Sequence, residues 1–307
     1  MSIQLKLKSF KSEVDGPKLL ITGGVHGDEF EPIAAIHRLI KLFETDDPVT
    51  ASFRGQVKFI PIVNEAAFIR GHRMAEDGLD LARVCPGSAD GSITEQAAAA
   101  LSEQIEQADY YIDLHTGGTE LSVFPLAGYT LHQDPQILEV QRRMAHAFNL
   151  SVVWGTAGNL KGRSLSVARD GNVPAIYTEH LGQATCHQDG VDAYVDGCLN
   201  VMGELGMLAR EQPASRIRYD VEDPRPGSGH MQVQNPSPMT GFFQPAVELG
   251  QEVKSGEPLG DVISLDGSQA CTINAEYDGV VLVLRTFPRV RKDESIGVVM
   301  ALNPSID

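Results

Sequence analysis

The chain has 307 residues, enough for one large or two ordinary domains, and its 41 acidic against 25 basic residues give a formal charge of −16. This charge disfavours nucleic acid and an anionic membrane surface as partners. No basic segment leads into a long apolar core near Met1, and no apolar run approaches membrane-spanning length, so we expect a cytoplasmic protein. The cysteines are scattered without a C-x-x-C pair and are expected to be reduced thiols: Cys85, Cys186, Cys198 and Cys271.

The first expected strand is the apolar run 19–22, which enters the glycine-rich turn 23–31. This turn carries His26 and Glu29, and Pro32 predicts a helix start just after it. The spacing His-x-x-Glu on a turn entering a helix places both side chains on the same side. Imidazole and carboxylate are zinc ligands, one short of the usual three of a catalytic site. A phosphate-binding loop is disfavoured, because the turn has neither Gly-Lys-Ser/Thr nor G-x-G-x-x-G.

The third ligand is expected from a second strand. After a helix over 31–44, a strand over 56–63 and a long charged segment over 64–86, a capping box at Ser92 and Glu95 predicts a helix through Gln107. The apolar run 110–114 then ends in His115, 89 residues after His26. Because open α/β sheets build their sites at the carboxyl ends of the strands, we expect His115 to join the other two ligands. Two close ligands and one distant ligand suit one catalytic zinc with an open fourth position.

Strands and helices continue to alternate beyond this point. We expect a helix from Asp134 to Phe148, a short strand over 152–154, a short helix over 162–170, a strand over 173–178 and a long helix over 188–208. This alternation predicts an α/β fold with a mixed, mostly parallel sheet flanked by helices on both faces.

The sequence changes character near residue 213, where Pro, Gly and short strands replace the helical periodicity. We therefore expect a catalytic domain over 1–213 and a small β domain over 214–307. The β domain contains two similar copies, 241–260 and 279–297, offset by 38 residues at the first glycine and 37 at the last. This arrangement resembles the barrel-sandwich hybrid of biotinyl and lipoyl domains. The segment 262–276 between the copies has no lysine, so we expect no attached cofactor.

A metal-activated water needs a proton acceptor, and Glu179, at the end of the strand over 173–178, is the best candidate. Arg73, in the long charged segment, is a candidate for stabilising the developing oxyanion. Asp113 shares a strand face with His115, so it either orients a ligand or only caps the strand end. Five histidines have no ligand-like spacing and are expected at the surface or in the core: His37, His132, His146, His187 and His230. His72 and His180 adjoin site residues, and a place in the pocket lining stays open for both.

These motifs together resemble the succinylglutamate desuccinylase/aspartoacylase family, whose fold is similar to that of zinc carboxypeptidases. The resemblance covers roughly residues 18–205 and rests on Gly-Gly-x-His-Gly-x-Glu, Asn…Arg…Asp-Leu-x-Arg, Asp-Leu-His-Thr-Gly and the strand-end Glu. It implies that His26, Glu29 and His115 hold Zn²⁺ and that Glu179 is the general base and then the acid.

The resemblance also implies roles for residues of the substrate pocket. Arg73, nine residues after Asn64, would polarise the scissile carbonyl, and Asn64 itself is assigned to substrate binding. The family's Asn-Arg pair holds a substrate carboxylate, but here the pair is Ala82-Arg83, so Arg83 alone would make this contact. A further substrate-binding arginine is Arg163 or Arg169, and we prefer Arg163.

We expect a zinc amidohydrolase that removes an acyl group from a small N-acyl amino acid of the N-acetyl diamino acid, N-acetylaspartate or N-succinylglutamate type. The alternatives are a metallocarboxypeptidase acting on peptides and a catalytically inert zinc-binding interaction protein. The acidic residues Glu76, Asp77 and Asp80 either form a solvated loop face or favour a substrate with an ammonium group. Assembly into a homo-oligomer is left open.

Overall fold

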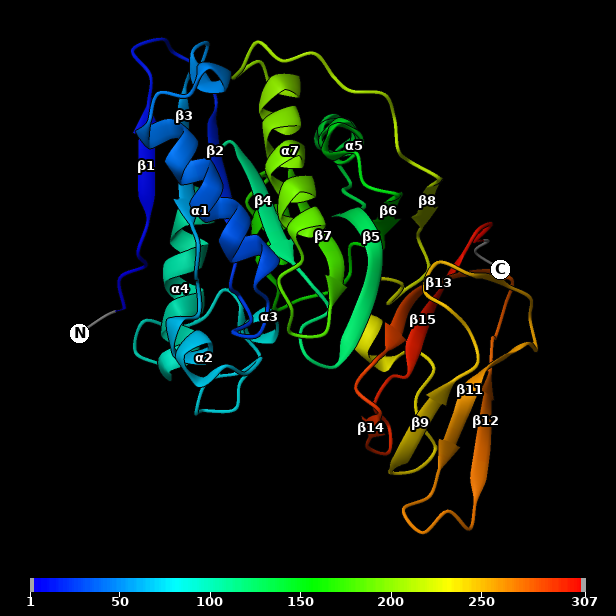
Figure 1. Ribbon diagram of the computed structural model, residues 1–307. Helices are drawn as coiled ribbons and strands as arrows, with labels where there is room; N and C mark the ends of the chain where they lie inside the picture. Colours follow the sequence, from blue (N-terminus) through cyan, green and yellow to red (C-terminus); the bar gives the residue numbers. More distant parts are fainter. Residues whose placement is uncertain (1–2, 305–307) are drawn as a thin grey trace.

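The computed structural model describes residues 3–304, and its centre is one large twisted sheet (Figure 1). Eleven strands form this sheet in the order β1-β3-β2-β4-β7-β5-β13-β10, with β6 on β5, β8 on β6 and β15 on β13. The strands before residue 224 are β1 (Lys8–Lys11), β2 (Lys18–Thr22), β3 (Gln56–Ile60), β4 (Tyr110–His115), β5 (Leu121–Thr130), β6 (Val152–Thr156), β7 (Ala175–Gly182) and β8 (Tyr219–Asp223).

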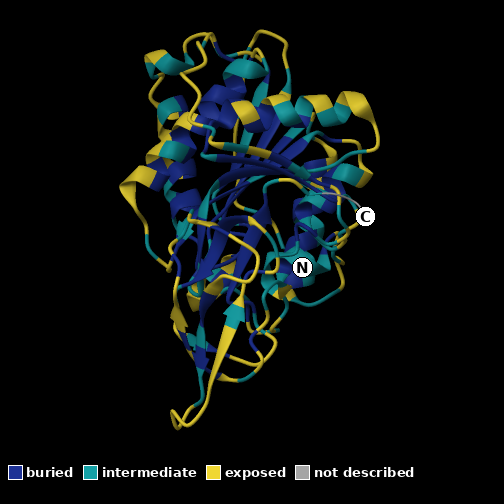
Figure 2. Cartoon of the chain, turned by 90° about the vertical axis from the view of Figure 1, so that its right-hand side faces the viewer, coloured by how far each residue is buried: buried dark blue, intermediate teal, exposed yellow. Residues whose placement is uncertain are grey.

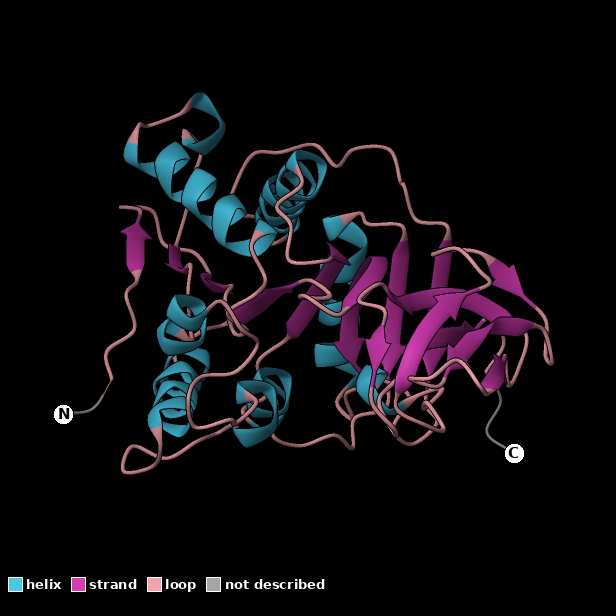
Figure 3. Cartoon of the chain, turned by 60° about the horizontal axis from the view of Figure 1, so that its bottom comes forward, coloured by secondary structure: helices cyan, strands magenta, loops and turns pink. Residues whose placement is uncertain are grey.

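Helices cover both faces of the sheet, as Figure 3 shows. They are α1 (Glu31–Glu44), α2 (Glu65–Arg70), α3 (Leu81–Val84), α4 (Ile93–Glu106), α5 (Pro135–Phe148), α6 (Ser164–Asp170) and α7 (Gln188–Glu204), with single 3₁₀ turns η1 (Pro48–Thr50) and η2 (Met231–Val233). Strand side chains alternate between the two layers. Leu19 and Ile21 of β2 pack with α1 and α7, whereas Leu20 packs in the core that α4 and α6 share. The predicted α/β fold with helices on both faces is confirmed.

The parallel strands β2, β4 and β7 bring the predicted site residues to one edge of the sheet. Thr22 of β2 lies opposite Asp113 of β4, and His115 lies opposite Glu179 of β7. The turn with His26 and Glu29 begins directly after β2, at the same edge. His115 and Glu179, which lie 89 and 153 residues after His26 in the sequence, therefore meet His26 at one edge of the sheet.

Several element boundaries differ from the prediction. The strand β5 was not predicted, and it pairs antiparallel with β7, which makes the sheet mixed. The long charged segment is not a continuous loop, because it contains the short helices α2 and α3. The strand expected over 56–63 ends at Ile60, and the helix expected to residue 208 ends at Glu204. The capping box that starts α4 is present as predicted.

The C-terminal repeat folds as two intertwined copies. Its strands are β9 (Gly241–Pro245), β10 (Glu252–Val253), β11 (Pro258–Ile263), β12 (Ala270–Asn274), β13 (Gly279–Arg285), β14 (Arg289–Val290) and β15 (Gly297–Ala301). The short strand of each copy pairs with the first strand of the other, β10 with β13 and β14 with β9. Equivalent positions such as Phe243 and Val281, or Val262 and Val299, meet in a shared core. The hairpin between β11 and β12 extends away from this core and is largely exposed at the lower end of Figure 2.

The β strands of the C-terminal part also continue the large sheet. β8, which follows residue 213, pairs parallel with β6, and β13 pairs antiparallel with the start of β5. Val283 of β13 lies opposite Val123 of β5 and reaches the edge of the site. The division at residue 213 stays a prediction, since the sheet crosses this point without a break. Within residues 3–304, no helix is long and apolar enough to cross a membrane.

Candidate active site

The buried side chains predicted as metal ligands converge at this edge of the sheet: His26, Glu29 and His115. Nδ1 of His26 lies 2.7 Å from Oε1 of Glu29, and Nδ1 of His115 lies 3.0 Å from Oε2 of the same carboxylate. Ligand atoms of the three residues all lie within 4.8 Å of one another, and the residues are at most 8% exposed. Two imidazole nitrogens and one carboxylate that meet in a buried space form a donor set for a single metal ion.

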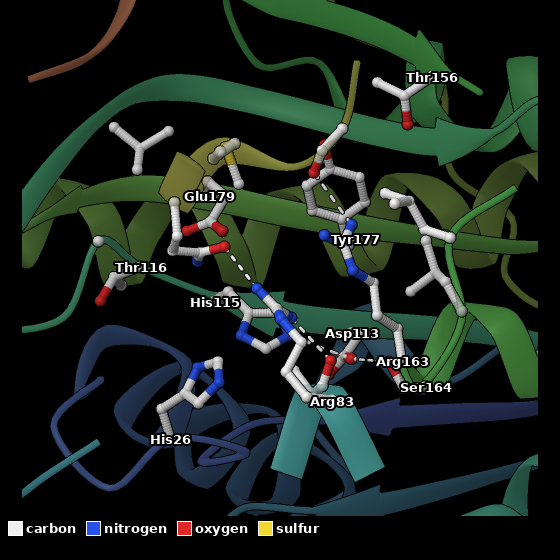
Figure 4. Close-up of a pocket in the computed structure, with 18 of the residues that line it drawn as sticks. His26, Arg83, Asp113, His115, Thr116, Thr156, Arg163, Ser164, Tyr177 and Glu179 are labelled. Atoms are coloured by element: carbon white, nitrogen blue, oxygen red, sulfur yellow. Dashed lines mark hydrogen bonds and ion pairs between the residues drawn. The ribbon is translucent and has the colours of Figure 1, made fainter. Parts of the chain in front are cut away.

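Two further carboxylates, those of Asp113 and Asp80, hold the imidazole rings of the two histidines in place. Nε2 of His115 lies 3.1 Å from Oδ2 of Asp113, and Nε2 of His26 lies 3.2 Å from Oδ1 of Asp80. An imidazole that donates Nε2–H to a carboxylate keeps the lone pair of Nδ1 for a metal. Both Nδ1 atoms face Glu29, so this orientation fits a bound cation. The geometry favours the orienting role of Asp113 over the strand-cap alternative (Figure 4).

Glu179 lies beside this centre (Figure 4). The strand expected over 173–178 continues to Gly182, so Glu179 lies within β7 and not at its end. Its side chain lines the same cavity as the three converging residues, and its buried Oε2 has no hydrogen-bond partner among the described residues. Burial raises the pKa of Glu179 to about 7 from its usual 4.5. A carboxylate with a free oxygen and a pKa near neutrality is suited to accept and return a proton.

Arg73 lies beside the predicted ligands. Its Nε and Nη2 donate to Oδ2 of Asp80 at 3.1 and 3.0 Å, and its Nη1 lies 3.9 Å from Oε1 of Glu29. Asp80 therefore connects Arg73 to His26 and also caps the first turn of α3 by accepting from the Ala82 amide at 2.9 Å. The guanidinium lines the cavity, where it can donate to a developing negative charge.

Two further arginines line the cavity. Arg83 donates to the carbonyl oxygen of Ala82 at 2.7 Å and to Oε1 of Gln232 at 2.5 Å, and Arg163 donates to the carbonyl oxygen of Gly229 at 3.0 Å. Neither guanidinium forms a salt bridge with a described carboxylate. Burial and the neighbouring Arg83 lower the pKa of Arg163 to about 10. Figure 4 shows both arginines extending side by side into the cavity, where an anionic group would relieve their repulsion.

Other predicted residues lie outside this arrangement. Asn64 caps α2, with its Oδ1 accepting from the Ala67 amide at 3.1 Å, and it does not line the cavity. Its substrate contact stays a prediction. Arg169 donates to the carbonyl oxygens of Gly158 and Leu160 and does not itself line the cavity, which favours Arg163 of the two alternatives.

The remaining histidines do not line the cavity. His72 is exposed, and His180 is buried behind the site, edge-on to Tyr194 at 6.1 Å between ring centroids. Four of the other five are exposed or half-buried away from it: His37, His132, His146 and His187. His230 is half-buried near Arg83 and Arg163, which together with burial lower its pKa.

The acidic residues of the long charged segment do not form an ammonium subsite. Asp77 accepts from the Thr94 amide and hydroxyl at 3.0 and 2.8 Å and thereby holds the start of α4. Asp80 is engaged by His26 and Arg73, and Glu76 is exposed. None of these carboxylates lines the cavity, so the local charge of the segment alone does not select a cationic substrate.

Sequence reasoning missed three contributors to the site. Gln232 comes from η2, far along the chain, and nothing near it in the sequence marked it as a site residue. Tyr194 of α7 donates its hydroxyl to the carbonyl oxygen of His115 and so fixes the end of β4. Tyr177, two residues before Glu179, faces the cavity, and the alternation of side chains along a strand could have identified it.

Comparisons with known proteins agree with this site. A model of the succinylglutamate desuccinylase/aspartoacylase catalytic domain matches residues 15–205. The N-alpha-acetyl-L-2,4-diaminobutyric acid deacetylase of Halomonas elongata is 30% identical over an alignment of length 306, and the match covers 95% of this chain and 84% of the relative.

Solved structures show the same fold. A succinylglutamate desuccinylase/aspartoacylase from Rhodobacter sphaeroides superposes with a TM-score of 0.86 at 25% identity and covers 99% of this chain and 90% of its own. The product-bound ectoine utilization protein of Ruegeria pomeroyi superposes with a TM-score of 0.85 at 24% identity, covering 95% of this chain and 87% of its own. The match of the family model and the similarity of a relative along almost the whole length establish that the chain belongs to the succinylglutamate desuccinylase/aspartoacylase family of hydrolases and is a metal-binding deacylase.

Proposed function

We propose that this protein is a zinc-dependent deacetylase of N-acetyl diamino acids. The observation that carries the proposal is the combination of groups that line one cavity. A buried His-Glu-His set and the unpartnered Glu179 line it together with two arginines that have no carboxylate partner among the described residues. The first set suits cleavage of an amide, and the two arginines suit an amino acid carboxylate. The relative from Halomonas elongata, named for deacetylation of an acetylated diaminobutyric acid, supports the diamino acid as substrate.

The donor set supports zinc as the metal. Two neutral imidazoles and one carboxylate are a frequent ligand set of catalytic zinc, which keeps one position open. Held by His26, Glu29 and His115, a zinc ion would supply Lewis acidity that polarises an acyl carbonyl and makes a water molecule more acidic. The carboxylates Asp80 and Asp113 fix both imidazole rings in the orientation that this binding requires.

Glu179 moves the proton. Its free Oε2 takes a proton from the attacking water while the oxygen of that water bonds to the acyl carbon. Arg73 donates to the carbonyl oxygen as negative charge develops there. Glu179 then gives the proton to the amide nitrogen, the C–N bond breaks, and acetic acid and a free amine leave. The raised pKa of Glu179 suits a group that first accepts and then donates within one cycle.

Arg83 and Arg163 hold the carboxylate of the substrate in this proposal. The C-terminal part closes the cavity above them, because Gly229, Met231 and Val283 belong to its lining. A roof of this kind favours a single acylated amino acid over a peptide, which argues against a carboxypeptidase. The buried and unpartnered Glu179 argues against an inert metal-binding protein, since an uncompensated buried acid lowers stability without serving the fold.

The test is a substrate panel with the zinc-loaded protein. N-acetyl-L-2,4-diaminobutyrate, N-acetylaspartate, N-succinylglutamate and a dipeptide are compared by kcat/KM in the wild type and in Ala82→Asn. We expect the diamino substrate to be preferred by the wild type. Adding an amide at position 82, where the family has Asn, should shift preference toward the dicarboxylic substrates by about one to two decades. A wild type that prefers N-acetylaspartate contradicts the proposed substrate, and turnover of the dipeptide alone contradicts the proposed reaction.

A further inference from the structure

The amide that lies beside Arg83 in this structure comes from a distant segment. The residue before Arg83 is Ala82, which lines the cavity and whose methyl group cannot form a hydrogen bond to a substrate. Gln232 lies 149 residues later in the sequence than Arg83, in η2, and its Oε1 accepts from Nη2 of Arg83 at 2.5 Å. Gln232 also lines the cavity, so its side chain meets the same space as Ala82 and Arg83.

We propose that Gln232 supplies the amide that position 82 lacks and binds the substrate carboxylate together with Arg83. This inference rests on the proposed function and assigns a specificity-determining residue to the C-terminal part of the chain. Because Oε1 accepts from Arg83, the amide nitrogen of Gln232 is held close to the guanidinium. Its two N–H groups have no acceptor among the described residues, so they are free to donate to a ligand.

The charges around Gln232 point to an anionic ligand. Arg83 and Arg163 lie together because the Cys85 amide, just after α3, donates to the carbonyl oxygen of Gly162 at 3.0 Å. The two guanidiniums bond to neutral oxygens of Ala82, Gly229 and Gln232 and to no described carboxylate. A carboxylate placed between them would accept from both cations and from the amide of Gln232, and such charge-assisted bonds are short and strong.

A purely structural role for Gln232 makes a different prediction. If its bond to Arg83 only held η2 against α3, its removal would loosen the roof and affect every substrate equally. If it binds the carboxylate, its removal affects only substrates that have one. An asparagine at position 82 should then restore the lost contact from the other side of Arg83.

The experiment compares the wild type, Gln232→Ala, the double variant Gln232→Ala/Ala82→Asn and the control Gln234→Ala. Gln234 donates to the carbonyl oxygen of Ser228 at 3.0 Å outside the cavity. Its replacement therefore tests whether a lost hydrogen bond near η2 lowers activity without any change in the groups that contact the substrate carboxylate. For the panel member that the wild type hydrolyses best, kcat/KM is measured on the free acid and on its carboxamide. Melting temperatures of all four proteins are recorded as a readout of folding.

We expect Gln232→Ala to lower kcat/KM about tenfold to a hundredfold for the free acid, mainly through KM, and less than about threefold for the carboxamide. The double variant should recover most of this loss, and Gln234→Ala should match the wild type. Equal losses on both compounds, no loss on either, or no recovery in the double variant would overturn the assignment of Gln232. A wild type that hydrolyses no member of the panel would refute the proposed function and this inference with it. This outcome is distinguishable from the other three, in which the wild type is active and only the assignment of Gln232 fails.

Discussion

Asp113 connects the fold to the metal centre, and its replacement by Asn is the most informative single change. The side chain is fully buried on β4. Its Oδ1 accepts from the Thr22 hydroxyl at 2.8 Å, and its Oδ2 accepts from the Ser164 hydroxyl and lies 3.1 Å from Nε2 of His115. Asparagine has the same shape, and its carbonyl oxygen can keep the bond to Thr22. Its NH₂ group then takes the place of Oδ2.

The magnitude follows from the tautomer of His115. An NH₂ group opposite Nε2 makes a donor face a donor, and the ring relieves this by moving its proton to Nδ1. The lone pair of Nδ1 is then no longer available to a metal. Removing a carboxylate that orients a metal-binding histidine typically lowers metal affinity about 10–100-fold, which corresponds to about 1.4–2.7 kcal/mol.

The assay is a competition between the protein and a chelator of known zinc affinity, followed by metal analysis. The matched control is Asp109→Asn, which removes an exposed carboxylate at the other end of the same strand, where Asp109 accepts from the Lys18 amide at 2.8 Å. We expect weaker zinc binding in Asp113→Asn and no change in Asp109→Asn. Unchanged zinc affinity in a folded Asp113→Asn protein would refute the reasoning about the tautomer.

Three further predictions concern the same site. Glu179→Gln keeps the size of the side chain but cannot accept a proton, so kcat should fall about 10²–10⁴-fold with zinc retained; near-normal turnover in a kinetic assay would exclude the proton role. Because Glu179 must be deprotonated to accept a proton, kcat/KM should fall as the pH is lowered through the pKa of Glu179, between the usual 4.5 and about 7. A bound cation moves this pKa toward the lower value. A kcat/KM that stays constant over this pH range would contradict the role. In Gly27→Ala the new methyl carbon would meet the backbone of Ala67 at 2.1 Å. The variant should therefore lose about 1–3 kcal/mol or more of folding free energy, melt at a lower temperature and bind zinc more weakly. A wild-type melting curve would show that the turn and α2 are not rigidly packed.

The sequence predicted best what depends on buried strands. The apolar runs of β2, β4 and β7 lead into the polar residues of the site, so both the position of these strands and their common edge could be inferred, although β7 continues past Glu179 to Gly182. β5 could not be inferred, because Pro125 and Gly128 lie inside it and usually argue against a strand. In the structure, the pairing of β5 with β7 shifts register between Val123 and Leu126 around Pro125. The bare backbone of Gly128 leaves room for the ring of Tyr177.

The site was predictable where the residue type itself implies chemistry. His26, Glu29 and His115 are recognised by their spacing and their place at strand ends. Asp80 and Gln232 are not, because their roles depend on which side chains the tertiary fold places next to them. Asp80 belonged to a segment with several charges, and only the structure shows that it contacts His26 whereas Asp77 contacts Thr94 at the start of α4. A glutamine that bonds to an arginine 149 residues away carries no local signal in the sequence.

The most direct test of the central claim is the metal content of His115→Ala together with its turnover of N-acetyl-L-2,4-diaminobutyrate. His146→Ala is the control, because His146 is exposed on α5 and lies outside the cavity. We predict about one zinc per chain and full turnover in the wild type and in the control, and loss of most of the zinc and of the turnover in His115→Ala. Undiminished zinc and turnover in His115→Ala would contradict the proposed centre of His26, Glu29 and His115.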